Sequence, residues 1–309
     1  MTVQCNLILD SCCELPEEIY DQPGIQMLHF SYTNSGKNYV DDIFQEISAH
    51  QFYEAMRNGA TPSTSQPAQS EIEEAFRAAI ASKIPTVYLA FSSGISGAYD
   101  GAIVALERMK AEFGNDIELY VVDTRVGSTP QGVLVMEALR LRDKGMTAKE
   151  MVAWAQEARF FLQTLFVVDD LESLRRGGRI PTGIAMAGAK LDVKPMLSFD
   201  IDGKLTLIGM ARGRKKAMKR MVEFFEKNHD ASQSSTIVAI GNADCPKDAT
   251  RFREMLQHNE ENTLFLETSI GPTIGCHVGP DMFSISFWGS DRREKLSVSD
   301  RIANRVKAS

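Results

Sequence analysis

Short apolar runs alternate with amphipathic stretches through the first half of the chain. The runs have the β-branched and aromatic content of buried strands, and they are Val3–Leu9, Ile25–Phe30, Thr86–Phe91 and Ile117–Val122. Apolar residues at three- and four-residue spacing predict helices over Ile43–Arg57, Ser70–Ser82, Ala98–Phe113 and Gly132–Lys144. This alternation predicts an α/β domain with a mainly parallel sheet flanked by helices.

The order of elements becomes less regular near residue 160, after one more amphipathic stretch at Met146–Phe161. Leu162–Val168 predicts a strand, Asp169–Arg176 a helix, and Asp200–Gly203 a hairpin turn. The other predicted elements are strands over Val193–Phe199, Lys204–Met210, Ile237–Ile240, Leu264–Glu267 and Phe283–Phe287, and helices over Arg214–Lys227 and Lys247–Gln257. We therefore expect two domains, an N-terminal α/β domain over residues 1–160 and a C-terminal α+β domain over residues 161–309.

Polar residues follow three of the predicted strands in the first domain. They are Asp10, Ser92–Ser96 and Asp123–Ser128. The carboxyl ends of parallel strands meet at one edge of a sheet, and ligands of such sheets bind outside that edge. We therefore expect these three segments to lie together on one rim.

The turn Ser92–Gly97 joins a predicted strand to a predicted helix. Free N–H groups at a helix start favour an anion, glycine allows close approach, and the hydroxyls of Ser93 and Ser96 add donors. The turn therefore indicates an anion site. A plain strand-to-helix connection, with Ser96 as the cap of the helix, explains the same residues.

Two further polar segments are candidates for ligand contacts. Thr61–Pro67 sets three hydroxyl residues between two prolines, which predicts a stiff extended loop or a surface linker. Ile270–Pro280 is dense in glycine and proline, which predicts a loop that fixes His277. A fixed imidazole can donate to a carboxylate or transfer a proton, although a lone histidine often does neither.

A basic cluster begins at Arg212 and continues through Arg220. It is compatible with phosphate handling, nucleic-acid binding or a solvated helix face. The formal net charge of −7 disfavours a nucleic-acid partner, because such proteins usually carry a basic surface. We expect no nucleic acid among the partners.

The rest of the composition narrows the class of protein. With 43% hydrophobic and 24% charged residues over 309 positions, the chain has the makeup of a soluble protein, and it contains no apolar run long enough to span a bilayer. The start lacks a secretory signal, and five cysteines without a C-x-x-C pair suit reduced thiols, so we expect a cytoplasmic location. Zinc spacings and the common nucleotide motifs are missing, so we expect neither a metal nor a cofactor.

Six motifs in order resemble those of the DegV family of bacterial fatty-acid-binding proteins, over about Val3 to Gly289. The motifs are Thr64-Ser65-Gln66-Pro67, Ser92-Ser93-Gly94-Ile95-Ser96-Gly97, Phe166-Val167-Val168-Asp169-Asp170-Leu171 with Gly177-Gly178-Arg179-Ile180, Val193-Lys194-Pro195-Met196-Leu197, Arg212-Gly213-Arg214-Lys215-Lys216, and Ile274-Gly275-Cys276-His277-Val278-Gly279. The chain departs from the family pattern D-S-T-x-D-L-P, because Cys12 and Glu14 replace a threonine and an aspartate. That puts the polar role of this turn in doubt. Cys276 also stands where threonine is common.

The resemblance implies a two-domain protein that holds one long-chain fatty acid at or near the domain junction. By match of motif, Thr64 and Ser96 contact the carboxylate, with Ser93 and His277 beside them, and Arg212 serves the phosphate-transfer step. It further implies an ATP-dependent fatty acid kinase as the partner, at most transient membrane contact, and no complete enzyme activity in this chain. For the alkyl chain, Phe160–Val168 and Ile184–Ala189 are candidate walls, or else ordinary core.

Two other functions remain as alternatives. A serine hydrolase would use Ser96 activated by His277, but Ala98 breaks the G-x-S-x-G turn typical of such enzymes. A regulatory DNA-binding protein would use the basic cluster from Arg212 to Arg220.

Overall fold

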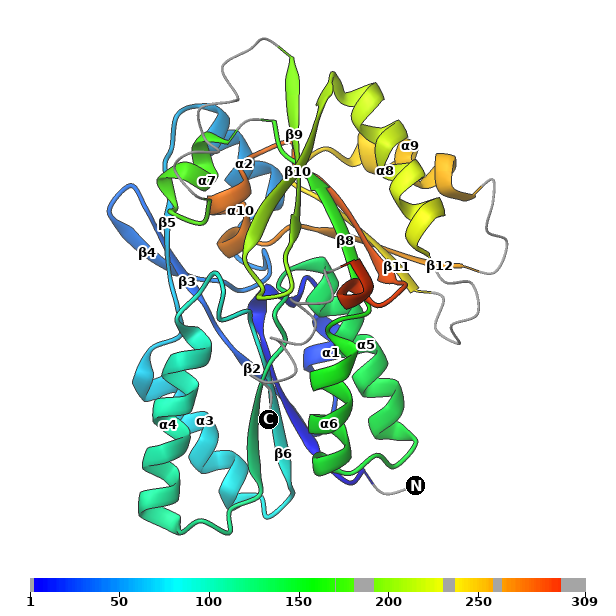
Figure 1. The fold of residues 1–309 in the computed structure, drawn as a ribbon. Helices are drawn as coiled ribbons and strands as arrows, with labels where there is room; N and C mark the ends of the chain where they lie inside the picture. Colours follow the sequence, from blue (N-terminus) through cyan, green and yellow to red (C-terminus); the bar gives the residue numbers. More distant parts are fainter. Residues whose placement is uncertain (1–2, 170, 181–191, 230–236, 258–262, 296–309) are drawn as a thin grey trace.

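The computed structural model describes residues 3–169, 171–180, 192–229, 237–257 and 263–295 (Figure 1). Its strands are β1 (Asn6–Asp10), β2 (Ile25–Leu28), β3 (Ser31–Asn34), β4 (Lys37–Val40), β5 (Ser63–Ser65), β6 (Thr86–Ala90), β7 (Leu119–Asp123), β8 (Leu162–Val167), β9 (Val193–Phe199), β10 (Leu205–Arg212), β11 (Ile237–Asn242), β12 (Leu264–Ser269) and β13 (Phe283–Trp288). Its α-helices are α1 (Glu17–Tyr20), α2 (Ala49–Arg57), α3 (Gln69–Ala81), α4 (Ala98–Phe113), α5 (Thr129–Asp143), α6 (Ala148–Ala158), α7 (Glu172–Arg176), α8 (Arg214–Asn228), α9 (Pro246–Gln257) and α10 (Pro272–Val278). Short 3-10 helices cover Ser11–Cys13 (η1) and Arg292–Lys295 (η3).

A parallel sheet in the order β2-β1-β6-β7 forms the lower half of the molecule (Figure 1). Its side chains alternate between faces, as strands require. Ile8 and Tyr88 pack with residues of α3 and α4 on one face, whereas Leu7 and Leu89 pack with α5 and α6 on the other. The predicted mainly parallel sheet flanked by helices is therefore confirmed.

A mixed sheet in the order β10-β9-β8-β13-β11-β12 forms the upper half. Only β11 and β12 of these neighbours run parallel. Helices α8 and α9 bury Met221, Phe225 and Phe252 against one face. Helix α5 contacts β8, β11 and β13 and also packs on α6, so it lies between the two sheets and is largely buried.

A small antiparallel sheet in the order β4-β3-β5 brings Thr64 into regular structure. Thr64 pairs with Tyr32 of β3, and α10 contacts both strands. The expected extended loop at Thr61–Pro67 therefore contains a short strand at its centre. The sequence did not predict β3 and β4, because Ser31–Val40 is polar and lacks clear alternation.

Two expectations about helices were wrong. The segment Ile270–Pro280 is not a loop throughout, because it contains α10, with Gly271 at its N-cap and proline in its first turn. Proline fits that place, since its missing N–H has no partner in a helix start. The helix expected from Ile43 begins instead at Ala49, where Ser48 and Gln51 form a capping box.

The hairpin between β9 and β10 contacts the turn after β6. A Cβ on Gly94 would lie 2.5 Å from the backbone carbonyl carbon of Gly203, so a larger residue would push the hairpin away. The hydroxyl of Ser92 donates to the Gly203 carbonyl at 2.8 Å, and Arg125 donates to the Ile201 carbonyl at 3.1 Å. The two halves are thus joined through main-chain carbonyls.

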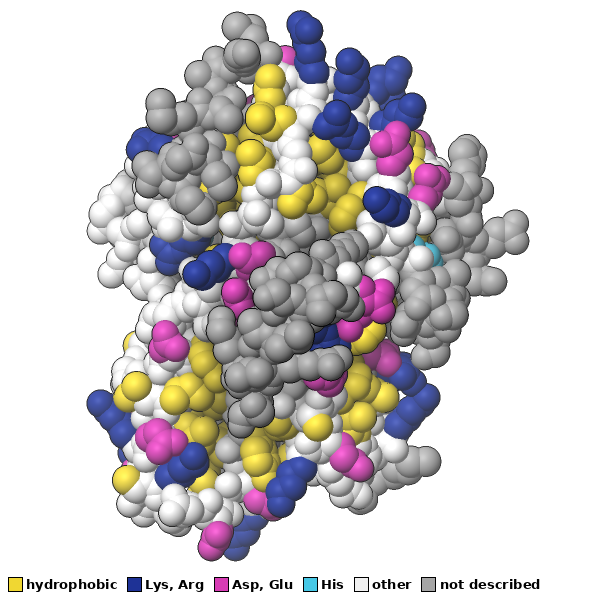
Figure 2. Space-filling model, in the orientation of Figure 1, with side chains coloured by type: hydrophobic (Ala, Val, Ile, Leu, Met, Phe, Trp, Pro, Cys, Tyr) yellow, Lys and Arg dark blue, Asp and Glu magenta, His cyan; other side chains and the backbone are white. Residues whose placement is uncertain are grey.

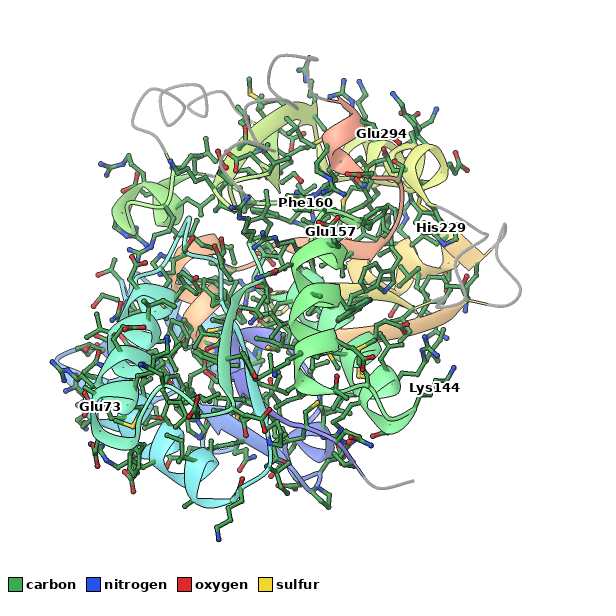
Figure 3. The ribbon with its side chains drawn as sticks, turned by 60° about the horizontal axis from the view of Figure 1, so that its bottom comes forward. Glu73, Lys144, Glu157, Phe160, His229 and Glu294 are labelled. Carbon is green, nitrogen blue, oxygen red and sulfur yellow. The ribbon has the colours of Figure 1, made fainter. Side chains whose placement is uncertain are left out.

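A second junction lies at the end of α6, where Phe160 and Glu157 are found (Figure 3). The guanidinium of Arg293 lies 4.4 Å from the centroid of the Phe160 ring and donates to Glu157 at 2.9 Å. Segment η3 is therefore fastened to the end of α6 by a cation–π contact and an ion pair.

Candidate ligand-binding site

The rim predicted from the strand ends is organised around Asp10. Its buried carboxylate accepts hydrogen bonds from the Phe91 N–H at 2.6 Å, the Tyr88 hydroxyl at 2.5 Å and the Gln131 amide at 2.9 Å. Burial raises the Asp10 pKa to about 6, against the effect of these donors. All three of these donors are protein groups. Asp10 therefore holds the turn after β6 in place, through its bond with the Phe91 N–H.

A cavity of about 790 Å³, including its open part, extends from this rim to the second sheet. Most of its wall is apolar, and the apolar side chains are Phe30, Phe91, Ile95, Pro130, Phe166, Leu174, Phe199, Leu205, Ile274, Val278 and Met282. Of the two segments that were candidates for the wall of an alkyl site or for ordinary core, Phe160–Val168 contributes Thr164 and Phe166, and Ile184–Ala189 lies outside the described residues.

Thr64 and His277 meet in this wall. Oγ1 of Thr64 lies 2.8 Å from Nε2 of His277, although they come from β5 and α10. Burial, followed by the nearby charge of Arg179, lowers the His277 pKa from its usual 6.5 to about 4. The imidazole is therefore neutral at neutral pH, with one nitrogen that donates and one that accepts.

Gly177 packs against His277 of this pair and the charge of Arg179 lies near it, and neither residue was predicted from the sequence to contact a ligand. A Cβ on Gly177 would overlap Nδ1 of His277, so only glycine allows the end of α7 to approach the ring. Arg179 lines the cavity and donates from Nε to the Ile95 carbonyl at 3.1 Å and from Nη1 to the Gly177 carbonyl. Burial lowers the Arg179 pKa. The family motif Gly177–Ile180 contains both residues and was the sequence signal that could have predicted their place beside the ligand.

The two candidate serines of the turn after β6 have different surroundings. Ser96 lines the cavity, and its Oγ accepts the Ala98 N–H at 3.2 Å, which leaves its proton for another partner. Gly97, rather than Ser96, is the N-cap of α4. Ser93 does not line the cavity, because its hydroxyl donates to Asp123 at 2.6 Å on the outer side of the turn.

An outer groove adjoins the cavity and shares four of its lining residues. The shared residues are Ile95, Ser96, Arg179 and Leu205. The groove also contains the side chains of Arg175 and Lys204 together with those of Asp100 and Asp200. Ser93 lines this groove and not the cavity.

Two buried carboxylates hold the start of α10, the helix that carries His277. Oε2 of Glu14 accepts the Gly271 N–H at 2.6 Å, and Oδ2 of Asp41 accepts the Thr273 N–H at 3.2 Å. Burial raises the pKa of Glu14 well above its usual range and that of Asp41 to about 6. The glutamate that departs from the family pattern therefore does have a polar role.

The cysteines in and near the site are buried and free. Cys12 packs with Phe30 and Phe91, which line the cavity, so its thiol sits behind the wall. Cys276 of α10 is also buried and free.

The geometry does not favour the serine hydrolase alternative. No hydrogen bond joins Ser96 to His277 in the part of the chain described, and the bond at Nε2 goes to Thr64. Nδ1 of His277 is buried without a hydrogen-bond partner among these residues, so no carboxylate orients the ring as a triad requires.

Arg212 is exposed at the end of β10 and does not line the cavity. Figure 2 shows Lys and Arg side chains gathered at the top of the molecule, in the region of β10 and α8. Within the described ranges, no group of three His, Cys, Asp or Glu side chains is arranged to hold a metal ion. None of the helices described is both long and apolar enough to cross a membrane.

Comparisons with known proteins find relatives that match nearly the whole chain. A DegV domain-containing protein of Clostridium perfringens is 33% identical over 286 residues, which are 93% of this chain and 98% of that protein. The structure of Bacillus subtilis DegV, described as a fatty acid binding protein, has a TM-score of 0.80 at 27% identity and matches 94% of this chain and 100% of its own.

A DegV family protein from Thermus thermophilus, whose structure is described in terms of fatty acid binding, has a TM-score of 0.79 at 26% identity. The match covers 93% of this chain and 100% of that one. A family model described as "Uncharacterised protein, DegV family" matches residues 4–289. Because this match spans nearly the whole sequence, the chain belongs to the DegV family.

Proposed function

We propose that this protein binds one long-chain fatty acid, with its carboxylate at Thr64, Ser96 and His277 and its alkyl chain in the apolar cavity. The observation that carries the proposal is the pairing of Thr64 with His277 in the wall of that cavity. The fatty-acid-binding descriptions of the Bacillus subtilis and Thermus thermophilus relatives support the same ligand class.

The charges around the cavity suit an ionised acid. The Nε2–H of the neutral His277 imidazole donates to Thr64, which leaves the hydroxyls of Thr64 and Ser96 to donate to the carboxylate, and the guanidinium of Arg179 supplies positive charge. Ser93 is left out of the carboxylate contacts, because its hydroxyl is bonded to Asp123.

Burial of the alkyl chain supplies most of the affinity. An acid of about 16 carbons has about 14 methylenes, and burial of each contributes about 0.8 kcal/mol, or roughly 11 kcal/mol in total. Association and ordering cost at least several kcal/mol, so tight binding remains. The cavity walls come from the turn after β6 and from β8, β9 and β10, which supports an acyl site at the junction of residues 1–160 and 161–309.

We further propose that the bound acid is presented to an ATP-dependent fatty acid kinase, and that this chain is the carrier rather than the enzyme. The proposal rests on the family resemblance and on Arg212, which is exposed and stands apart from the cavity wall. It also assigns the protein to the cytoplasm, where the kinase has ATP, and leaves at most transient contact with a membrane.

Native mass spectrometry of the protein purified from bacteria tests the binding proposal. We expect an added mass equal to one long-chain fatty acid, which organic extraction releases for identification. A protein that is always empty, and that also fails to bind added palmitic or oleic acid in calorimetry, would refute the proposal.

A further inference from the structure

Four buried hydroxyl side chains form a continuous chain of hydrogen bonds beside the cavity. Oγ of Ser284 lies 3.2 Å from Oγ1 of Thr129, which lies 2.8 Å from Oγ of Ser286. Oγ of Ser286 in turn lies 2.9 Å from Oγ1 of Thr164. Each of the four residues is at most 3% exposed, so bulk water does not satisfy them.

The end of this chain at Thr164 fixes its direction. The Thr164 hydroxyl lies 3.1 Å from the Ile285 carbonyl, and a carbonyl can only accept a hydrogen bond. With its single proton given to Ile285, Thr164 accepts from Ser286, Ser286 accepts from Thr129, and Thr129 accepts from Ser284. Ser284 is then left with acceptor capacity that no described hydrogen bond uses.

Ser284, Thr129 and Thr164 all line the cavity. They come from β13, the start of α5 and β8, whereas Thr64, Ser96 and His277 come from β5, the turn after β6 and α10. The cavity therefore has these two polar places on different elements, in addition to the polar residues Gln66, Ser128, Arg179 and Thr273 of its wall. A plain fatty acid has one polar group and satisfies one of them.

We propose that the preferred ligand is a hydroxylated long-chain fatty acid, whose hydroxyl along the chain donates to Ser284. This inference rests on the proposed function, since the carboxylate occupies the first polar place. Burial of a hydroxyl without a partner is costly, and a hydrogen bond to Ser284 removes that cost. An oxo group at the same carbon only accepts, so it cannot replace the hydroxyl at Ser284.

Calorimetric competition with stearic acid, a set of stearic acids that each carry one hydroxyl at a different carbon, and the matching oxo acids tests the inference. We expect one hydroxy acid to bind about fivefold more tightly than stearic acid, the gain of one net hydrogen bond. The oxo acid with its oxygen at the same carbon should show no such gain.

Ser284→Ala should bring the ratio of hydroxy-acid affinity to stearic-acid affinity to one or below. Thr129→Val, which keeps the shape and removes the acceptor of the Ser284 proton, should keep the preference for the hydroxy acid and should let the matching oxo acid gain affinity, because the Ser284 hydroxyl can then donate. Ser198→Ala is the matched control, because Ser198 belongs to β9 of the same sheet, bonds to the Thr164 carbonyl and does not line the cavity. That variant should keep the wild-type ratio.

The outcomes separate this inference from the proposed function. If stearic acid binds at least as tightly as every hydroxy acid, or if the preference survives in Ser284→Ala, the inference is wrong while fatty acid binding stands. A plain acid bound together with an ordered water on Ser284, with no hydroxy preference, has the same meaning. If no acid of any kind binds, the proposed function fails and this inference fails with it.

Discussion

Gly177 and His277 are packed so closely that a Cβ on the glycine would overlap Nδ1 of the imidazole. The Gly177→Ala variant should therefore displace the ring and disturb its contact with Thr64. Such overpacking costs about 1–3 kcal/mol, and we expect fatty acid affinity to fall by about tenfold or more. Calorimetric titration with palmitic acid measures the change.

Gly209→Ala is the matched control for that substitution. Gly209 has an ordinary backbone angle, and a Cβ there would meet no heavy atom closer than 4.0 Å. Its affinity for palmitic acid should stay within about twofold of the wild type, since a substitution that meets no neighbouring atom and lies away from the cavity usually changes little. Equal losses in both variants would show that the ring contact of Gly177 has no special role.

Removal of the hydroxyl of Thr64 or Ser96 should weaken binding. If each donates one hydrogen bond to a charged carboxylate, Thr64→Val and Ser96→Ala should each lose about 1–3 kcal/mol of binding free energy. Ser93→Ala should bind almost as the wild type does, because that hydroxyl is bonded to Asp123 outside the cavity. Unchanged affinity in both of the first two variants would show that the carboxylate lies elsewhere.

His277 should make stability depend on pH in a specific window. Its pKa is about 4 in the folded protein and about 6.5 when unfolded, so between these values the unfolded chain binds the extra proton. The free energy of unfolding at neutral pH therefore includes a contribution from the neutral, buried His277. That contribution is lost as the pH falls from about 6.5 to 4. Urea denaturation of the wild type and of His277→Gln should show their stability difference shrinking over that window.

The comparison with His277→Gln is needed because buried carboxyl groups act in the opposite sense. The pKa values of Asp10 and Asp41 are raised to about 6, so the folded state gains protons first and is stabilised as the pH falls through 6. The wild type and His277→Gln share that effect of the carboxyl groups, so it cancels in the difference between their free energies of unfolding. Burial is the main cause at His277, so high salt should leave the slope in place. A difference independent of pH would contradict the neutral, buried state of His277.

Arg212→Ala should separate binding from phosphorylation. The side chain is exposed and away from the cavity, so affinity for the acid should change by less than about twofold. Phosphorylation by the fatty acid kinase, followed with labelled ATP, should slow by tenfold or more if Arg212 contributes to that step. Lys216→Ala, another exposed basic residue of the cluster, is the control. Equal rates in both variants would remove Arg212 from the proposal.

The elements of the sheets were largely predictable, because their patterns are local. The predicted strand Val193–Phe199 and helix Ala98–Phe113 have the bounds found in the structure. The rim of strand ends was confirmed, since the Phe91 N–H donates to Asp10 and the Ser93 hydroxyl donates to Asp123. These contacts follow directly from the parallel order of β1, β6 and β7.

The assembly of the site was less predictable, because it depends on contacts between distant segments. Nothing in the local pattern places Thr64 against His277, 213 positions away. The glycine and proline content around His277 concealed a helix that exists because Glu14 and Asp41 accept the N–H groups at its start. Arg179 lies beyond the predicted helix Asp169–Arg176, and its contact with Ile95 appears only in three dimensions.

The contacts of the β9–β10 hairpin have a consequence for how relatives of this protein can diverge. Ser92 and Arg125 donate hydrogen bonds to the main-chain carbonyl oxygens of Gly203 and Ile201, and every amino acid has that oxygen. Substitution of Ile201 would leave its bond intact, whereas deletion of one residue would shift both carbonyls out of reach. The length of this connection should thus be under stronger selection than the identity of the side chain at 201.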